Sequence, residues 1–378
     1  MSLSTTELAF ARQGALHDCR TDGRQRLEIR PISVKRGTSA YANGSATASI
    51  GFVGTAGSRS GETTVVTAAV TCDVAEATGP EVDGEPRLGD IRFNVDIEQF
   101  GAPSAAIEGG AVSGAGNFQR REMEQALTRA LVAAYGVPEA DQSSPEEIAS
   151  RYTPVAAPSR RTPAQLLEQA RSKAPGAPID LASLYISHAH AFVLVVDVQV
   201  RSASAGNVFG AALAAIRSAL ADTLLPTPTV TVNDGVAAVH LNSKQRTRRV
   251  ISNRCPLAVS VSMDPSAGVY VADPAPAEER AFPFVGHVAV AADTSGAAPS
   301  DTARHHQIVW SAFSGTRQPE PEAADDGSAV VRRANGVGCG VSAMELCALL
   351  GEASGALFNE IATSIVDDAA PEDEMLTA

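Results

Sequence analysis

A proline-rich stretch near the middle of the chain separates two segments that carry the same kind of pattern. Seven prolines lie among polar residues in 138–178, which is typical of an inserted surface loop, with one short helix expected at about 164–170. On each side of this stretch, several short strand patterns precede one helix pattern. We therefore expect an α+β fold with a first half at about 10–137, the inserted loop at about 138–178 and a second half at about 179–366.

The first half begins with short segments rich in small and β-branched residues. Residues 45–52 and 63–70 are bounded by glycine, and 91–97 alternates apolar and polar residues, so all three are predicted strands. Apolar residues then recur at three- and four-residue steps, which predicts a helix that closes at Gly136 and Pro138. The apolar positions of this helix are Met123, Ala126, Leu127, Ala130, Leu131 and Ala134.

The second half opens with a short valine-rich run at 191–196, which is typical of a central strand. A second helix pattern follows and stops at Pro226; its apolar face is Phe209, Ala212, Leu213, Ile216, Leu220 and Leu224. Further strands are predicted at 229–232, 257–263, 268–271, 285–291 and 308–311. A last helix is predicted from the capping box of Ser342 and Glu345 to Ile365, and the acidic tail at 367–378 is predicted to be disordered.

The composition limits the partners that the chain can bind. The sequence has 30 Lys and Arg against 43 Asp and Glu, and this net charge of −13 argues against a surface that binds nucleic acid everywhere. Aromatic residues make up only 4%, which disfavours an aromatic platform for stacking bases. No stretch resembles a membrane span or a signal peptide, so we expect a soluble intracellular chain with no membrane contact.

Cysteine and histidine spacing gives no sign of a metal site. The five cysteines are scattered and form no Cys-x-x-Cys pair, so we expect reduced and mostly buried thiols. The pair His305 and His306 lacks a third ligand at helical spacing and is predicted to lie in a solvated loop. We therefore expect neither a metal nor a cofactor.

Four motifs, in the same order and spacing, resemble those of the RNase PH family. They are Cys-Arg-Thr-Asp-Gly-Arg at 19–24 with Arg-Pro at 30–31, Ala-Asn-Gly-Ser-Ala at 42–46, Leu-Tyr-Ile at 184–186 and Gly-Asn-Val-Phe at 206–209. The resemblance implies one RNase PH-type domain at about 10–366, made of two pseudo-symmetric βαβ-type halves (ribosomal protein S5 domain 2-like) with the proline-rich insertion between them.

The resemblance also implies what a working site would contain. Domains of this family form hexameric rings that thread single-stranded RNA, and active members cleave it from the 3′ end with phosphate. Such chemistry needs cations for the phosphate and a carboxylate near the leaving oxygen. Gln199 and Ser204 stand where active relatives carry acids, and Asn207 and Val208 replace their Thr-Arg. Asp197 remains, and a structural hydrogen-bonding role in the central strand is favoured for it. We therefore expect no catalytic residues.

Gly-Asn at 206–207 is similar to the non-catalytic ring subunits of the exosome, the forty-two type first and the forty-three type next. This resemblance implies a structural and RNA-guiding role in 3′-to-5′ RNA processing and degradation, rRNA processing included. Its implied partners are other RNase PH-like subunits, cap subunits with RNA-binding domains and RNA in the pore. Its implied location is the nucleus, the nucleolus and the cytoplasm. An active phosphate-dependent 3′-to-5′ exoribonuclease and an unrelated α+β binding protein are the alternatives.

Arginines are the remaining candidates for contact with RNA. Arg120 and Arg121 follow a glycine-containing run and are predicted to lie at a helix N-terminus, where the helix dipole favours phosphate. Arg20 and Arg24 are instead predicted to pair with a carboxylate such as Asp22 or Glu28. The densest basic run is predicted to contact an acidic neighbour. It consists of Lys244, Arg246, Arg248, Arg249 and Arg254.

Overall fold

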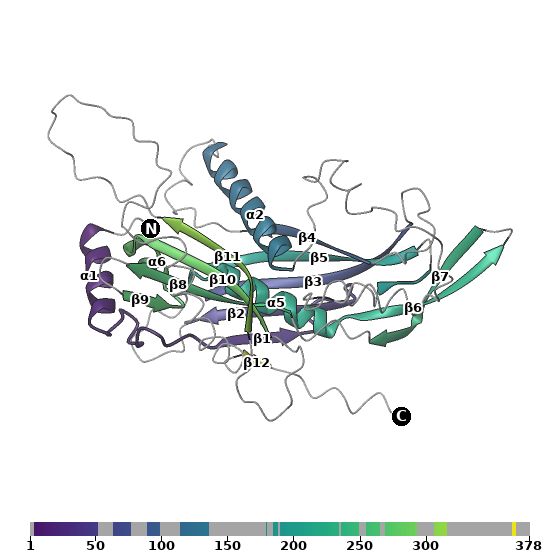
Figure 1. Cartoon of the computed structure of the whole chain (residues 1–378), viewed down its shortest axis with the longest axis horizontal. Helices are drawn as coiled ribbons and strands as arrows, with labels where there is room; N and C mark the ends of the chain where they lie inside the picture. Colours follow the sequence, from purple (N-terminus) through teal and green to yellow (C-terminus); the bar gives the residue numbers. More distant parts are fainter. Residues whose placement is uncertain are drawn as a thin grey trace, which may run out of the picture.

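A computed structural model of the chain describes residues 4–51, 63–76, 89–98, 114–135, 179, 184–187, 190–233, 236–248, 255–264, 269–292, 306–315 and 365–367. Figure 1 shows that its strands form two sheets and a separate hairpin, with one helix in the centre. Among these residues, no helix is long and apolar enough to cross a membrane.

The first sheet has six strands in the order β12-β1-β2-β3-β5-β4. Its members are β1 (Ile32–Arg36), β2 (Gly44–Gly51), β3 (Thr63–Glu76), β4 (Asp90–Ile97), β5 (His190–Ala203) and β12 (Ile365–Asp367). β4 runs parallel to β5, and β12 runs parallel to β1, whereas the other neighbours are antiparallel. The first part of β5 is buried on both faces, which explains its continuous apolar run and confirms the predicted central strand.

β5 follows the proline-rich stretch in sequence but pairs between β3 and β4, which precede it. The sequence boundary at 138–178 therefore does not separate the sheets. The inserted loop itself lies outside the described residues.

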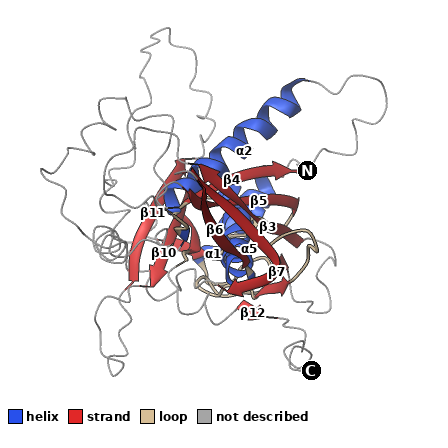
Figure 2. Cartoon of the chain, turned by 90° about the vertical axis from the view of Figure 1, so that its right-hand side faces the viewer, coloured by secondary structure: helices blue, strands red, loops and turns tan. Residues whose placement is uncertain are grey.

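The second sheet has four strands in the order β11-β10-β8-β9. They are β8 (Leu257–Asp264), β9 (Val269–Ala272), β10 (Phe284–Ala292) and β11 (His306–Gly315), and all neighbours are antiparallel. β6 (Leu224–Asn233) and β7 (Val236–Arg248) pair only with each other, as a hairpin that projects from the body in Figure 1. In Figure 2 the end of the molecule that carries this hairpin faces the viewer.

Helix α5 (Val208–Asp222) packs between the two sheets, against β1, β2, β3 and β5 on one side and β8 on the other. Eleven of its fifteen residues are buried, so it is apolar on almost all sides rather than amphipathic. Its many alanines allow close packing, and so does Gly44 on β2. A Cβ atom at Gly44 would lie 2.5 Å from the Ala219 carbonyl oxygen, which explains the glycine in the 42–46 motif.

Three further helices cover the edges. α2 (Gly114–Ala134) packs on β4 and contacts β11, while α1 (Thr5–Leu16) packs on α6 (Pro276–Ala281) and β9. Ser4 and Glu7 form a capping box at the start of α1. The sequence patterns did not predict α1 or α6.

Several predictions need correction. α2 begins at Gly114, so Arg120 and Arg121 lie inside the helix and not at its N-terminus; the glycines of this run did not prevent helix formation. Ile365 and Asp367 belong to β12 and not to the last helix or the tail, because pairing with β1 places them in the sheet. The rest of that helix and tail, and the short helix at 164–170, lie outside the described residues.

Two smaller predictions also differ. His306 begins strand β11 and so does not lie in a loop. Cys255 is buried as expected, but Cys19 is exposed because it lies in the turn after α1. Cys339 and Cys347 lie outside the described residues.

Candidate functional site at the start of helix α5

The positions at which the sequence predicts missing carboxylates lie at one end of β5. Gln199 Nε2 donates to Glu98 Oε1 at 2.6 Å. Ser204 is exposed, and its hydroxyl donates to the Thr63 carbonyl oxygen at 2.9 Å and accepts from the Thr63 N–H at 3.0 Å. Asp197 is exposed too and accepts a hydrogen bond from Asn94 Nδ2 at 2.9 Å, so it makes a hydrogen bond across β4 and β5, and its structural role stays a prediction. These side chains join neighbouring strands.

Asn207 is the N-cap of α5. It adopts the left-handed conformation (φ 49°), and its side-chain oxygen accepts from the Gly210 N–H at 3.1 Å. Asparagine tolerates this conformation better than most residues do. Val208, the first helical residue, packs against the hydrophobic core. Asn207 and Val208, which stand where active relatives carry Thr-Arg, therefore both hold the start of α5 in place.

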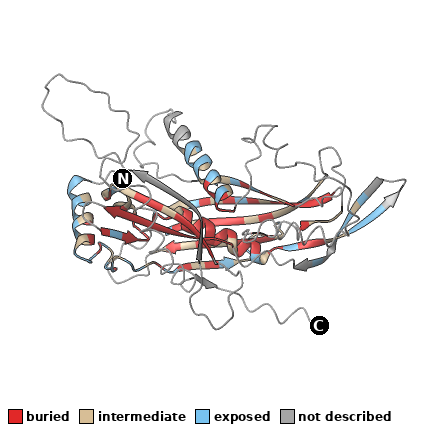
Figure 3. Cartoon of the chain, in the orientation of Figure 1, coloured by how far each residue is buried: buried red, intermediate tan, exposed pale blue. Residues whose placement is uncertain are grey.

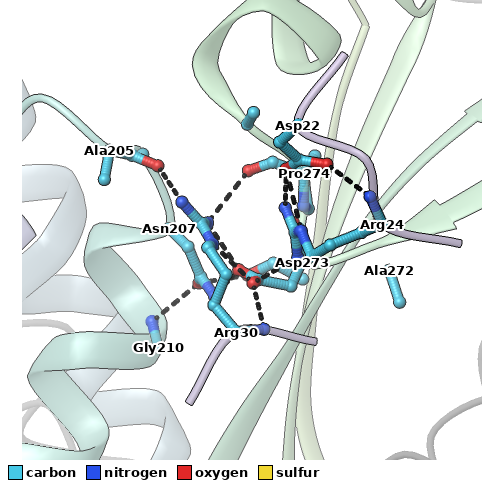
Figure 4. A network of polar contacts seen from close by, with 12 residues as sticks. Asp22, Arg24, Arg30, Ala205, Asn207, Gly210, Ala272, Asp273 and Pro274 are labelled. Atoms are coloured by element: carbon cyan, nitrogen blue, oxygen red, sulfur yellow. Dashed lines mark hydrogen bonds and ion pairs between the residues drawn. The ribbon is translucent and has the colours of Figure 1, made fainter. Parts of the chain in front are cut away.

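The Asn207 amide also joins a buried ionic cluster, shown in Figure 4, whose centre is Asp273. Asn207 Nδ2 donates to Asp273 Oδ1 at 2.8 Å. Arg30 binds both carboxylate oxygens, through Nε and Nη2, each at 2.7 Å, and Arg24 Nη1 donates to Oδ2 at 3.0 Å. The Arg30 N–H donates to Oδ2 as well, at 2.9 Å. The Asp273 carboxylate is thus saturated with donors.

These donors control the pKa of Asp273. Burial alone would raise it, but the hydrogen bonds and charge of Arg30, together with the charge of Arg24, lower the pKa of Asp273 to about 2. A carboxylate that holds its negative charge so firmly cannot accept a proton near neutral pH. Asp273 is therefore suited to a structural role and not to general-base catalysis.

A second buried pair extends the cluster. Arg20 Nε donates to Glu278 Oε1 at 2.8 Å, and Arg20 Nη2 donates to Glu278 Oε2 at 2.5 Å. Arg20 also donates to the carbonyl oxygens of Ala272 and Asp273, each at 2.9 Å. Arg24 Nε binds Asp22 at 2.8 Å. The predicted structural pairing of both arginines is confirmed, although Arg20 takes Glu278 as its main partner.

Ser260 and His287 extend the hydrogen-bond network from the side chain of Asn207. Asn207 Oδ1 can only accept, so the Ser260 hydroxyl donates its one hydrogen to that oxygen at 2.8 Å. The Ser260 oxygen must therefore accept the second hydrogen bond, from His287 Nδ1 at 2.9 Å. His287 is therefore the tautomer protonated at Nδ1. Burial lowers the pKa of His287 to about 4, which keeps its ring neutral.

Glu279 lies at the open side of the same helix start. Its Oε1 accepts from the Asn207 backbone N–H at 3.3 Å, and burial raises its pKa. Gly206 (φ 73°) allows this approach, because a Cβ there would lie 3.1 Å from Glu279 Oε1. The adjoining cavity, lined by Arg30, Asn207, Ser260 and Asp273 among others, has room for about one water molecule.

The two arginines predicted to bind RNA lie on α2, away from this cluster in sequence. Arg120 Nη2 binds Asp96 at 2.6 Å, and Arg120 Nε binds Glu124 at 2.8 Å, so its charge is already compensated. Asp96 pairs with Gln199 in the register of β4 and β5, which places Arg120 at the same end of the sheet as Gln199. Arg121 is exposed.

The sequence patterns missed the acidic side of the cluster. Asp273 directly follows β9, and Glu278 and Glu279 lie within α6, whereas the arginines of the cluster precede β1. The sequence signal for this cluster is the group of acids at 273–279 together with Arg20, Arg24 and Arg30, but no local pattern connects the two groups. In the part of the chain that the structure describes, no group of three His, Cys, Asp or Glu side chains could hold a metal ion.

No protein-family model and no curated protein sequence matches the chain significantly. Several solved structures, in contrast, match the chain. A chain of the Archaeoglobus fulgidus exosome with RNA bound to the active site has a TM-score of 0.55 at 15% identity, over 95% of this chain and 97% of that one. A chain of an archaeal exosome core gives 0.54 at 15% identity, over 94% and 96%. Rice (Oryza sativa) Rrp46 gives 0.42 at 15% identity, over 91% and 96%.

The fold can be identified from the two archaeal matches, which cover almost the whole of each chain. At 15% identity they establish the fold and no more. The chain has the α+β fold of the RNase PH-type subunits of the exosome core, as the four sequence motifs predict.

Proposed function

We propose that the chain is a non-catalytic subunit of an exosome core ring, which supports and guides RNA while other subunits carry out 3′-to-5′ processing and degradation. The proposed partners are RNase PH-like neighbours in a hexameric ring, cap subunits with RNA-binding domains, and single-stranded RNA in the assembled pore. The fold supports a place in the ring. The Gly-Asn motif at 206–207 favours the forty-two type, and the forty-three type comes next. The proposed location is the nucleus, the nucleolus and the cytoplasm.

One observation carries the non-catalytic part of this proposal. The N-terminus of α5 is where active relatives are expected to hold phosphate with Thr-Arg. Here the protein's own groups occupy it: the Asn207 side chain binds the Gly210 N–H, and the Glu279 carboxylate binds the Asn207 N–H. Val208 packs into the core and offers no positive charge.

The nearby cations do not compensate for this loss. The Arg30 guanidinium donates to Asp273, to the Ala205 carbonyl oxygen at 2.6 Å and to the Pro274 carbonyl oxygen at 3.4 Å. Arg30 is also buried. A phosphate entering this site would have to displace a saturated ionic cluster and approach the Glu279 carboxylate, and both steps are unfavourable.

A second candidate function, phosphate-dependent exoribonuclease, draws on a single observation. Glu279 is a half-buried carboxyl group with a raised pKa beside the start of α5, and carboxyl groups with raised pKa values occur at sites of proton transfer. In the proposed ring subunit the same group instead neutralises the helix N-terminus.

The test is phosphorolysis by a ring in which only this chain could be active. The chain is co-expressed with the RNase PH-fold chains of its own genome, whose catalytic carboxylates are replaced by amides. We expect no phosphate-dependent release of nucleoside diphosphates from a single-stranded RNA. Ser204→Asp should not restore activity, because Gln199 and Val208 remain. Release that depends on phosphate and disappears in Glu279→Gln would establish the enzyme and overturn the proposal.

A further inference from the structure

The β6–β7 hairpin (224–248) is the element that the proposed function has not used. Figure 1 shows it extending beyond both sheets, and no other described helix or strand packs along it. Its base is fixed, however. The Leu224 N–H donates to the Asn43 carbonyl oxygen at 2.8 Å, and Asn43 Nδ2 donates to the Leu224 carbonyl oxygen at 3.1 Å. Asn43 Oδ1 also accepts from the Cys72 N–H at 3.0 Å, so the hairpin leaves the body in a fixed direction.

The register gives the hairpin one apolar face. Val230 pairs with Val239, and Pro228 pairs with Leu241. Residues directly opposite each other, and those two positions along a strand, share a face, so these four side chains lie together. Val230 is 37% exposed and Leu241 is 42% exposed. Figure 3 shows the exposed colour on part of the hairpin away from its base.

The opposite face of the hairpin carries mostly polar side chains. Thr229 pairs with His240, and Thr231 pairs with Ala238; all four are exposed. A two-stranded hairpin with both faces in water is marginally stable, and an apolar face needs a surface to pack on. The described part of this chain supplies none.

We propose that this apolar face, formed by Pro228, Val230, Val239 and Leu241, is the docking surface for a neighbouring RNase PH-fold chain in the assembly; this inference rests on the proposed function. Because the base of the hairpin is already held by hydrogen bonds to Asn43, the hairpin does not have to become ordered when the neighbour binds. Binding then costs little conformational entropy.

The charge of the hairpin region fits an acidic protein neighbour. Residues 224–254 carry five basic residues and one acidic residue, whereas the rest of the chain has a net charge of −17. Arg246 at the hairpin base is exposed. A neighbour as acidic as the body of this chain would therefore meet a basic hairpin base beside an apolar face.

RNA is the weaker candidate occupant. The sequence from 224 to 248 contains no Phe, Tyr or Trp, so the hairpin offers no ring on which a base could stack. The exposed side chains of Val230 and Leu241 are apolar and make no favourable contact with phosphates. The hairpin therefore matches a protein surface better than a nucleic acid.

The test compares two matched double variants in the co-expressed complex. Val230→Asp with Leu241→Asp places two charges on the apolar face. Thr231→Asp with His240→Asp places two charges in the same diagonal relation on the opposite face. We expect the first variant to weaken binding of at least one RNase PH-fold neighbour on the order of a hundredfold in affinity capture and analytical ultracentrifugation. The second should assemble like the wild type.

Each other outcome overturns the proposal in a distinguishable way. If the wild type assembles and both double variants assemble equally well, the hairpin does not dock, while the proposed function stands. If the first variant assembles but loses affinity for a uridine 20-mer, the hairpin binds RNA instead. If it only prevents self-association, the occupant is a second copy of this chain. If the wild type captures no RNase PH-fold chain, the proposed function fails as well.

Discussion

Replacement of Asp273 by asparagine should destabilise the fold strongly, because this carboxylate neutralises two buried arginines. Arg30 and Arg24 would keep their shape-matched neighbour but lose its negative charge. Breaking a buried ion pair from one side costs roughly 3–5 kcal/mol. The asparagine oxygen can still accept a hydrogen bond, so we expect about 3 kcal/mol. This is a large share of a typical domain stability of about 5–15 kcal/mol.

The pH dependence gives an independent magnitude for the same group. The pKa of Asp273 is about 2 in the folded protein against an ordinary value of 3.8, which corresponds to about 2 kcal/mol of folding free energy. Because the folded pKa is depressed, this stabilisation is fully present above the unfolded pKa and is lost as the pH falls towards 2. About half of it should be lost by pH 3.

The assay is urea denaturation of the soluble protein or complex, followed by far-UV circular dichroism from pH 7 to pH 3. Asp273→Asn should unfold at lower urea at pH 7 and should lose less stability than the wild type on acidification. Asp18→Asn is the matched control, because Asp18 is exposed, has a positive φ that asparagine tolerates, and pairs with Arg26 at the surface. Equal stabilities of Asp273→Asn and the wild type at pH 7, or parallel pH profiles, would refute this reasoning.

Three further predictions concern the cap, the RNA path and assembly. Asn207→Ala should cost about 1–2 kcal/mol because the N-cap is removed, measured by the same denaturation assay, and an unchanged midpoint would contradict the role of Asn207 as the cap of α5. Arg121→Glu should weaken RNA binding by the assembled complex and reduce the slope of log affinity against log salt by about 0.7 for each phosphate that is no longer neutralised, whereas Arg129→Glu, exposed on the same helix, should change neither. If Arg121→Glu leaves both unchanged, Arg121 is not on the RNA path. The isolated chain should self-associate and become soluble on co-expression with an RNase PH-fold neighbour, as followed by size-exclusion chromatography; a well-behaved monomer that ignores such neighbours would count against a ring subunit.

Local patterns in the sequence predicted most of the central strands and helices. The valine-rich run at 191–196, the alternation at 91–97 and the apolar spacing from Phe209 to Leu220 correspond to β5, β4 and α5. These patterns succeed because burial of one or both faces imposes a period on nearby residues. The same patterns missed α1, whose first turn is set by a capping box and whose buried residues are only Ala11 and Ala15.

The candidate site was predicted only in part. The four motifs directed attention to Asn207 and Val208, and the fold confirms that these residues begin the central helix. What Asn207 does there depends on Asp273, Ser260 and the Gly210 N–H, and two of these lie more than fifty residues away. Likewise, the sequence indicated that Arg20 would be paired but not that Glu278 would be its partner.

The sequence by itself determined where most of the central strands and helices form, because those choices depend on the periodicity of neighbouring side chains. Only the tertiary structure decided that Arg20 meets Glu278, 258 residues further along the chain, and that Asp273 meets Arg24 and Arg30. It also decided that the 224–248 hairpin leaves the body with an apolar face in water. The physical reason is that a charge–charge contact has no period. An arginine is compatible with any carboxylate in the chain until the folded backbone buries the two together.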